Sequence, residues 1–380
     1  MWASFFIVFL FYASYSAVLF FFYRRSKRLE GGEAATEFFY PRVSLIVPVY
    51  NEEKTIAKKI QNIMELDYPG DKIEVLLVDG CSTDKTPEAI EDQTRDCETT
   101  VRLIKQDRRE GYTRGMLKGI SSSTGDIIVA TDAGAYHSPD AMKHLVKHFK
   151  NPRVGAVTGK EIVLGRSKGL GPRLEKSYRF FYDLMRSAET EMSSTADTKG
   201  EILAVRRDIC DVISKRLEFT PNASFDSCVP YEAKLMGYST VYDGLATYYE
   251  YAPSSFMDRM RQQVRRATSL IGALLMYRVM LLRRKYDKFG LVILPAHFIM
   301  DCLLPWIFLV GVGCLLVLTF LAPIITVPLW TIALGGILVT EKSRLFLVSF
   351  VQSQVALANA TLTLAARRES MLIETIPSTR

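Results

Sequence analysis

The sequence has few of the residues that form disulfides or bind transition metals. Its 380 residues include six cysteines and four histidines. No two cysteines form a C-x-x-C pair, and neither residue type recurs at a spacing typical of metal ligands. Internal repeats and low-complexity tracts are also absent. We therefore expect neither a disulfide-stabilised domain nor a zinc site.

Charge is absent from residues 3–23, a run of aromatic and aliphatic side chains at the start of the chain. About twenty apolar residues in a helix match the roughly 30 Å hydrocarbon core of a bilayer. A cleaved signal peptide is the alternative, but such a peptide carries its positive charges before a shorter apolar stretch. Here the basic cluster follows, at 24–28, so residues 1–23 are interpreted as an N-terminal transmembrane helix.

The formal net charge is +7 and the isoelectric point is near 9.0, values that suit an anionic partner such as nucleic acid or acidic lipids. Basic residues gather beside the apolar segments, as at 24–28, 261–266 and 283–285. Anionic lipid head groups fit this distribution better than nucleic acid does. A basic cluster directly after a span tends to stay in the cytosol. We therefore expect an integral membrane protein whose large middle region is cytosolic.

Between residues 42 and 253, after a polar linker at 24–41, short β-branched runs alternate with helical patterns. The runs lie at 43–47, 73–78, 101–104 and 127–130, and the helical stretches at 52–66, 84–95, 112–122 and 139–150. This alternation predicts βαβ units and an α/β domain with a mostly parallel sheet. Further elements are expected as a strand at 153–163, a helix at 170–191, a strand at 198–206, a helix at 224–236 and a short last strand at 239–242.

The last third of the chain becomes apolar. Residues 254–285 predict a long amphipathic helix with a basic face, inside an interfacial segment at 254–288. A C-terminal transmembrane region is expected at 289–366, with apolar stretches at 289–322, 325–340 and 345–365, and a tail follows at 367–380. Polar residues interrupt the third stretch, so the number and orientation of these spans stay open.

Acidic and polar residues follow several of the predicted strands. Asp79 ends the second strand, and Asp132 follows the fourth. The first strand runs into a loop that contains Pro48, Tyr50 and Glu52. Ligands of such domains bind where the carboxyl ends of the strands meet. Each carboxylate alone would be a solvated turn residue or a helix cap; together they indicate a nucleotide site.

With these motifs the chain resembles the family 2 glycosyltransferases, which are inverting enzymes of the GT-A fold, over roughly residues 42–270. Its layout is similar to the branch that contains ceramide glucosyltransferases and the hyaluronan, chitin and cellulose synthases. The resemblance implies that Asp79 contacts the uridine of a UDP-sugar. It also implies that Asp132 lies beside the ribose and ligates a Mg²⁺ or Mn²⁺ ion on the diphosphate. Gly134 replaces the second carboxylate of the family's D-x-D motif.

Downstream motifs extend the resemblance to catalysis. The segment around Asp226 stands in the place of the family's Thr-Glu-Asp motif, which implies that Asp226 is the general base. Gln262 to Arg266 resembles the Q-x-x-R-W motif, with Arg266 in place of the tryptophan. A spacing of three puts Gln262 and Arg265 on one face of a helix, where Arg265 can bind a diphosphate. Glu201 is expected near the acceptor.

The family's glycine-lysine pair after the third strand reads Gly111-Tyr112 here, so Arg109 or Arg114 is expected to bind the diphosphate instead. The predicted donor-binding residues are Pro48, Tyr50, Glu52, Asp79, Arg109, Arg114, Asp132, Ala133, Gln262, Arg265 and Arg266.

The sequence thus predicts an inverting transfer of a sugar from a nucleotide-sugar, UDP-linked by preference, to a hydroxyl of a lipid or saccharide at the membrane. A polyprenyl-phosphate sugar transferase and a processive polysaccharide synthase are alternatives within the enzymes. A membrane scaffold that keeps a residual nucleotide-binding domain is the non-enzymatic alternative. The carboxylates at 79, 132 and 226 favour an enzyme.

Overall fold

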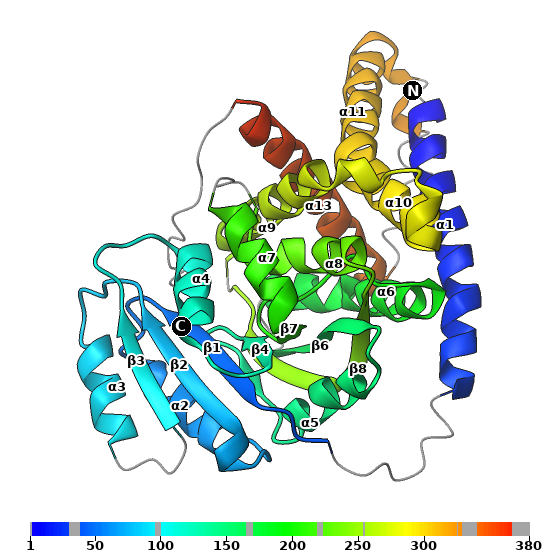
Figure 1. Ribbon diagram of the computed structural model, residues 1–380. Helices are drawn as coiled ribbons and strands as arrows, with labels where there is room; N and C mark the ends of the chain where they lie inside the picture. Colours follow the sequence, from blue (N-terminus) through cyan, green and yellow to red (C-terminus); the bar gives the residue numbers. More distant parts are fainter. Residues whose placement is uncertain are drawn as a thin grey trace.

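A computed structural model describes residues 2–29, 39–95, 100–164, 170–218, 223–253, 255–324, 326–328 and 340–366. An α/β domain lies at one end of the molecule, and long helices project from it at the other end (Figure 1). The centre of the domain is an eight-stranded sheet in the order β3-β2-β1-β4-β7-β6-β8-β5. The predicted α/β class is therefore confirmed.

The first four strands, β1 to β4, lie close to the ranges that the sequence predicts. Strand β1 pairs in parallel with β2 on one side and with β4 on the other, and β2 pairs in parallel with β3. The carboxyl ends of these four strands therefore lie at the same edge of the sheet. β7 is antiparallel to both β4 and β6. The bounds are β1 Val43–Val49, β2 Ile73–Asp79, β3 Thr100–Lys105, β4 Ile127–Ala130, β5 Tyr136–His137, β6 Val154–Leu164, β7 Leu203–Arg206 and β8 Ser239–Tyr251.

Helices cover both faces of the sheet, and alternate residues of each strand face opposite cores. On β1, Ile46 packs in the core under α4, α7 and α8, whereas Leu45 and Val47 pack against α2, α3 and α5. This alternation follows from the two-residue period of a strand. The domain helices are α2 Ile56–Met64, α3 Thr86–Thr94, α4 Tyr112–Ser122, α5 Ala141–Val146, α6 Leu170–Met192, α7 Arg207–Leu217, α8 Phe225–Leu235 and α9 Phe256–Met276.

Two predicted boundaries are wrong. The last strand, expected to be short, continues to Tyr251 beyond Asp243 and Gly244, because β8 pairs in parallel with β6 as far as Leu164. The amphipathic helix expected at 254–285 ends at Met276 and gives way to short 3-10 turns, and Leu282 then adopts a positive φ of 57° that no helix continues through. Helix α7 and strand β5 have no counterpart in the prediction.

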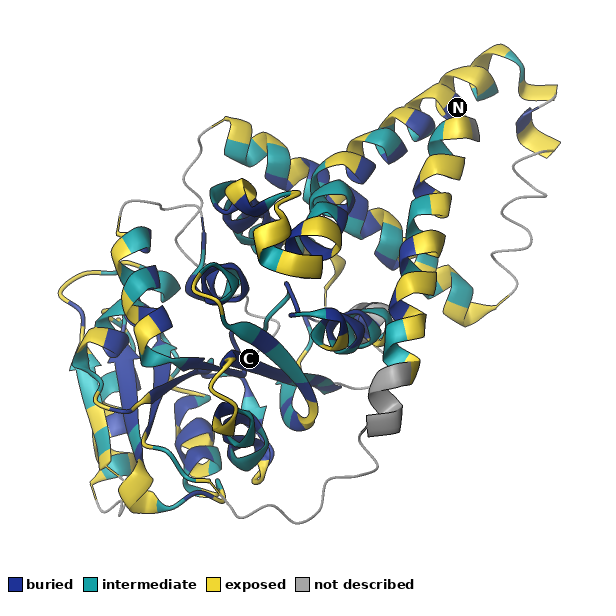
Figure 2. Ribbon diagram, turned by 45° about the vertical axis from the view of Figure 1, so that its right-hand side comes forward, coloured by how far each residue is buried: buried dark blue, intermediate teal, exposed yellow. Residues whose placement is uncertain are grey.

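Within the described residues, three helices are long and apolar enough to cross a membrane, at Ala3–Arg24, Phe289–Leu321 and Glu341–Ala365. They belong to α1 (Trp2–Leu29), to the run from 289 that ends in α11 (Leu304–Leu321), and to α13 (Glu341–Ala365). Figure 2 shows exposed residues along the outer parts of these helices. Phe9 and Phe320 are 70% and 86% exposed, which suits contact with lipid chains better than contact with water.

Several predicted segments are only partly covered by the described residues. The linker expected at 24–41 begins too early in the prediction, because α1 continues to Leu29; its residues 30–38 lie outside the described ones, as do most of the apolar stretch expected at 325–340 and the tail expected at 367–380.

The apolar helices join the domain through α6. Buried residues of α1, α6 and the 296–308 segment form one cluster, including Leu19, Met185 and Met300. Within it the Tyr15 hydroxyl donates to Glu189 Oε1 at 2.7 Å, and His297 Nε2 lies 2.8 Å from the same oxygen. Buried polar contacts of this kind set the position of the three elements relative to one another.

Candidate active site

Two cavities meet at the edge of the sheet where β1, β2 and β4 end. The first, called the strand-edge cavity, measures about 370 Å³ and is lined by loops after these strands. The second, called the helix-side cavity, measures about 270 Å³ and runs from the sheet edge toward α6, α9 and α13. Four residues line both cavities: Tyr112, Asp132, Gln262 and Arg265. Two ligands can therefore meet at these residues.

The loop after β1 forms one wall of the strand-edge cavity. Pro48, Tyr50 and Glu52 all line it, as predicted from their place in the sequence. The guanidinium carbon of Arg109 lies 4.0 Å from the centre of the Tyr50 ring, so the two side chains form a flat cation-aromatic surface. The carboxylate of Glu52 also accepts a hydrogen bond from the Thr55 hydroxyl at the start of α2.

The loops after β1 and β2 are tied together. Asn51 N donates to Ser82 Oγ at 2.9 Å, and Thr83 N donates to Asn51 Oδ1 at 2.8 Å. Asp79 lies at the end of β2, where both carboxylate oxygens accept from Ser82 N at 3.2–3.3 Å. The cavity is lined by its neighbour Gly80 and not by Asp79 itself. In this structure, Asp79 shapes the loop that was expected to hold the nucleoside.

A fully buried lysine supports the loop that carries Asp132. Lys59 Nζ donates to Thr131 Oγ1 at 2.9 Å and to the Ala135 carbonyl, so it holds the loop on both sides of Asp132. Burial lowers the pKa of Lys59 to about 7, against the attraction of Asp132. His137 Nε2 lies 3.1 Å from Thr131 Oγ1 and 2.9 Å from the Glu201 carbonyl. The position of Asp132 is thus fixed from beneath the sheet edge.

Three carboxylates face the junction of the two cavities: Asp132, Glu201 and Asp226. Burial, together with the charges of Glu201 and Asp226, raises the pKa of Asp132 to about 7, against the opposing charges of Arg265 and Arg266. Burial also raises the pKa of Asp226, with Glu201 adding to it and the Ser224 hydroxyl opposing it. A carboxylate with a raised pKa is a better proton acceptor near neutral pH.

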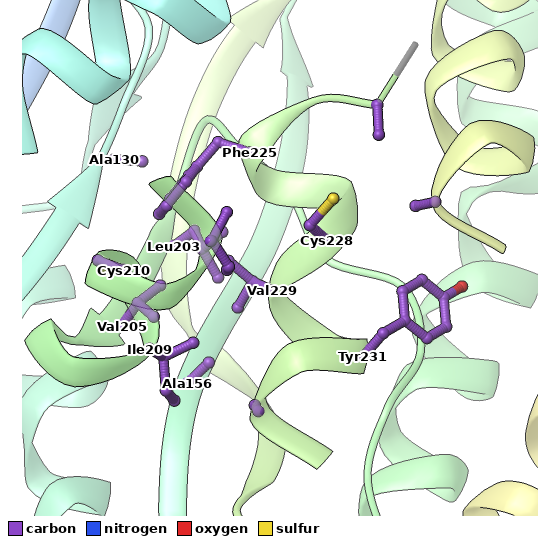
Figure 3. Packing of buried hydrophobic residues seen from close by; sticks show 14 of the residues in the cluster. Ala130, Ala156, Leu203, Val205, Ile209, Cys210, Phe225, Cys228, Val229 and Tyr231 are labelled. Atoms are coloured by element: carbon purple, nitrogen blue, oxygen red, sulfur yellow. The ribbon is translucent and has the colours of Figure 1, made fainter. Parts of the chain in front are cut away.

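Asp226 sits in the first turn of α8, and the packing of that helix fixes its place. Phe225, Cys228 and Val229 of α8 pack on β7 and α7 (Figure 3). A Cβ on Gly200 would lie 3.2 Å from Asp226 Cγ and 3.2 Å from the Tyr112 hydroxyl, so a larger residue there would crowd both side chains. Asp226 therefore faces the helix-side cavity beside Tyr112.

Helix α9 supplies the cationic side of the junction. Gln262 and Arg265 line both cavities, in agreement with the helical spacing of their motif. Arg265 forms no ion pair with any residue that the structure describes. Burial and the charge of Arg266 lower its pKa. Arg265 is thus the cation that remains available for an anionic ligand.

Arg266 and Arg114 do not take the places expected of donor-binding residues. Arg266 lines only the helix-side cavity, and its Nη2 donates to Glu201 Oε1 at 2.7 Å. Although burial raises the pKa of Glu201, the nearby cations of Arg266 and Lys199 outweigh it and hold the pKa at about 2. Arg114 lines neither cavity, because its guanidinium donates to the Glu218 carbonyl at 3.2 Å. Of the two arginines proposed to replace the family's lysine, only Arg109 lies at the site.

Several lining residues escaped the sequence analysis. Tyr112 was noted only as a departure from a motif, yet it lines both cavities, and its buried hydroxyl has no hydrogen-bond partner among the described residues. The signal in the sequence was its position directly after Gly111. In the structure, Gly111 has a φ of +83° and Tyr112 begins α4. The deeper residues of the helix-side cavity are missing from the prediction too: Glu175, Arg179, Arg186, Asp197, Lys199 and Asp301.

The donor set suits a divalent cation that shares its ligands with a phosphate. Asp132 Oδ1 is buried and accepts no hydrogen bond from the described part of the chain. The described residues hold no group of three acidic, histidine or cysteine side chains that would enclose a metal alone. Mg²⁺ and Mn²⁺ commonly bind through one or two carboxylates, phosphate oxygens and water. Asp132 and its neighbour Ala133, which also lines the strand-edge cavity, fit that arrangement.

Comparison with known sequences identifies the domain. Residues 44–212 match the family model Glycosyl transferase family 2. The β-monoglucosyldiacylglycerol synthase of Synechocystis sp. is 39% identical over 128 residues, which cover 33% of this chain and 26% of that protein. The poly-β-1,6-N-acetyl-D-glucosamine synthase of Staphylococcus epidermidis is 21% identical over 224 residues, 59% of this chain and 53% of that protein. The chain spans about a quarter to a half of the length of these relatives.

A solved structure resembles the chain over almost its whole length. The mannosyltransferase PcManGT from Pyrobaculum calidifontis, in complex with GDP-Man and Mn²⁺, has a TM-score of 0.75 and 25% sequence identity. The match covers 96% of this chain and 99% of that one. It confirms the predicted GT-A fold with its apolar helices. Residues 44–212 therefore form a glycosyl transferase family 2 domain, in a chain whose fold resembles that mannosyltransferase over almost its whole length.

Proposed function

We propose that the protein transfers a sugar from a nucleoside diphosphate sugar to a hydroxyl of a membrane lipid or saccharide, with inversion at the anomeric carbon. One observation carries this proposal. The carboxylates of Asp132 and Asp226 and the unpaired Arg265 meet where the strand-edge and helix-side cavities join. A site with one metal-binding carboxylate, one basic carboxylate and one anion-binding cation has the parts that glycosyl transfer from a diphosphate needs.

The donor lies in the strand-edge cavity in this proposal. Its nucleoside packs between the loops after β1 and β2, near Pro48, Tyr50 and Gly80, which line the cavity. Its diphosphate reaches the junction, where Arg265 binds it through two nitrogen atoms. Arg109, stacked on Tyr50, adds a second positive charge on the same side. A divalent cation on Asp132 would neutralise charge on the diphosphate and so favour its departure.

The transfer step then runs across the junction. The acceptor hydroxyl lies in the helix-side cavity, where its oxygen attacks the anomeric carbon from the side opposite the diphosphate. As the new C–O bond forms, the Asp226 carboxylate takes the hydroxyl proton and the bond from the anomeric carbon to the diphosphate oxygen breaks. The electron pair leaves with the nucleoside diphosphate. Arg265 stabilises the negative charge that develops there.

The acceptor comes from the membrane side in this proposal. Three described helices can span a bilayer, and the helix-side cavity is lined by Ser353, Ala356 and Leu357 of one of them. Two of the relatives reported above are a glucosyldiacylglycerol synthase and a polysaccharide synthase. The basic residues at 24–28, in the last turns of α1, favour a catalytic domain on the cytosolic side.

A donor panel tests the proposal. Detergent-solubilised protein with Mn²⁺ or Mg²⁺ is incubated with UDP-glucose, UDP-N-acetylglucosamine, UDP-galactose and GDP-mannose, and release of the nucleoside diphosphate is measured. We expect slow hydrolysis of one donor well above the others, because water can occupy the acceptor position. If no donor is cleaved in detergent or in membranes that contain cellular lipids, the protein is not a glycosyltransferase of this kind.

The position of Gly134 offers a test of metal binding. A Cβ on this residue would meet nothing within 4 Å, so a side chain fits without displacing the loop. Gly134→Asp adds a second carboxylate near Asp132, and an added charged ligand strengthens cation binding. We expect the Mn²⁺ concentration for half-maximal donor hydrolysis to fall on the order of tenfold.

Gly134→Ala is the matched control, because it restricts the backbone to the same degree without a carboxylate. Its metal requirement should equal that of the unmodified protein. If Gly134→Asp and Gly134→Ala require the same Mn²⁺ concentration, the cation does not lie beside residue 132.

A further inference from the structure

The deep end of the helix-side cavity combines α6, which lies inside the match to the family model, with α13 and part of an apolar run, which lie outside it. Beyond Asp226 the wall contains Arg186 of α6 and Asp301, which belongs to a π-helical segment, Ile299–Leu303. This segment lies inside the apolar run Phe289–Leu321. Ionisable residues within such runs are costly and commonly mark a pathway or a binding site. π-helical segments also concentrate at functional sites.

The cations of the wall are already neutralised, apart from Arg265 at the junction. Lys199 Nζ lies 3.3 Å from Glu161, and Arg266 donates to Glu201 at 2.7 Å. Deeper in, two arginines have carboxylate partners as well: Arg179 pairs with Glu161 and Glu175, and Arg186 pairs with Asp197. The residues that line the cavity include six carboxylates and five cations. A negatively charged head group would therefore find each cation of the deep end already paired with a carboxylate.

Unused polar atoms do remain in this wall. Among the described residues that line this cavity, the buried atoms without a hydrogen bond include Tyr112 Oη, Arg186 Nη1, Gln263 Oε1 and Asp301 Oδ2. The Arg186 side chain is 2% exposed, and its Nη1 lies 3.6 Å from Asp183 Oδ1. Asp301 Oδ2 lies 3.7 Å from His297 Nδ1. The set combines groups that only donate, such as Arg186, with groups that only accept, such as Asp301.

Hydroxyl groups match such a set and phosphate groups do not. A hydroxyl both donates and accepts, so one hydroxyl can satisfy a carboxylate and another an arginine. A phosphate dianion only accepts, and it would leave Asp301 and Gln263 without a donor while adding repulsion. Leu270 of α9 and Ala356 and Leu357 of α13 complete the wall with apolar surface. The cavity therefore offers polar groups to a head and an apolar side to a chain.

We propose, on the basis of the function proposed above, that the deep end of the helix-side cavity binds an uncharged, hydroxyl-bearing lipid head group as the acceptor. Asp301 and Arg186 bind its hydroxyls, and its apolar chain lies against Leu270, Ala356 and Leu357. A lipid whose head is a phosphate monoester is a poor acceptor, because the carboxylates of the wall repel it.

An acceptor panel in mixed micelles tests the head group. With the donor identified by hydrolysis, transfer is measured to dioleoylglycerol, to glucosyl-dioleoylglycerol and to undecaprenyl phosphate, and the products are identified by mass. We expect a kcat/KM at least tenfold higher for one of the two uncharged lipids than for the phosphate. Donor hydrolysis without transfer to either uncharged lipid, or with preferred transfer to the phosphate, overturns this inference and leaves the proposed function intact. Absence of any donor cleavage refutes both.

Two variants test the place of binding. Asp301→Asn replaces the carboxylate that accepts a hydrogen bond from the head-group hydroxyl with a weaker acceptor. Ser353→Leu fills the apolar side of the cavity. Each should raise the KM for the uncharged lipid at least fivefold, while the KM for the donor changes less than twofold. Asn359→Leu makes a comparable change on the exposed face of α13 and should leave both constants unchanged. Unchanged lipid KM in both cavity variants, in folded protein, places the acceptor elsewhere.

Discussion

Asp226→Asn is expected to lower kcat by about a thousandfold, because an amide cannot take the proton of the acceptor hydroxyl. The substitution keeps the shape of the side chain, so α8 and its packing through Phe225 and Cys228 should persist. Asp226 lines the helix-side cavity but not the strand-edge cavity. The KM for the donor should therefore change only a few-fold. Initial rates at saturating acceptor, together with donor binding by calorimetry, separate the two effects.

Asp208→Asn is the matched control. Asp208 also lies in the first turn of a helix, α7, and its carboxylate accepts from the Tyr238 hydroxyl at 2.7 Å outside both cavities. Its kcat should stay within twofold of the unmodified protein. Turnover of Asp226→Asn at the level of Asp208→Asn would remove Asp226 from the mechanism.

Arg265→Ala is expected to lower kcat/KM for the donor by about a hundredfold or more. Loss of one donor of hydrogen bonds to a developing anion typically costs this much. Arg265 has no ion-pair partner among the described residues, so its removal leaves no carboxylate newly unpaired and little change of stability is expected. Thermal unfolding in detergent checks the fold, and kinetics over a range of donor concentrations measures the loss.

Arg261→Ala provides the comparison on the same helix. Its side chain is 71% exposed, its Nη1 lies 3.9 Å from Asp258 Oδ1, and it lines neither cavity. Both arginines are one turn apart on α9, so effects on helix propensity are shared. Equal kinetics for the two variants would show that Arg265 does not bind the diphosphate.

The parts of the site that the sequence predicts are those governed by local rules. Strands followed by helices place Asp132 at the end of β4, and a spacing of three in a helix places Gln262 and Arg265 on one face. Both placements follow from the order of strands and helices along the chain and from the regular period of each. The predicted fold class and family rest on the same rules, repeated along the chain.

Tertiary contacts decide the rest, and no local rule states them. Arg266 looks equivalent to Arg265 in the sequence, but the Glu201 carboxylate, 65 residues away, pairs with it. Arg114 points to the Glu218 carbonyl because α4 packs against α7. Asp301 stands inside an apolar run, where only the fold reveals that it lines a cavity shared with Asp226. Such pairings depend on which helix faces lie together.

Helix α9 has contacts at both ends of the proposed reaction. It carries Arg265, and it packs along α13, one of the helices that can cross the bilayer. A bilayer of different thickness changes the tilt of a spanning helix. Tilting α13 would move α9 and with it the guanidinium of Arg265. The affinity for the nucleotide-sugar donor should therefore depend on the lipid composition of the membrane.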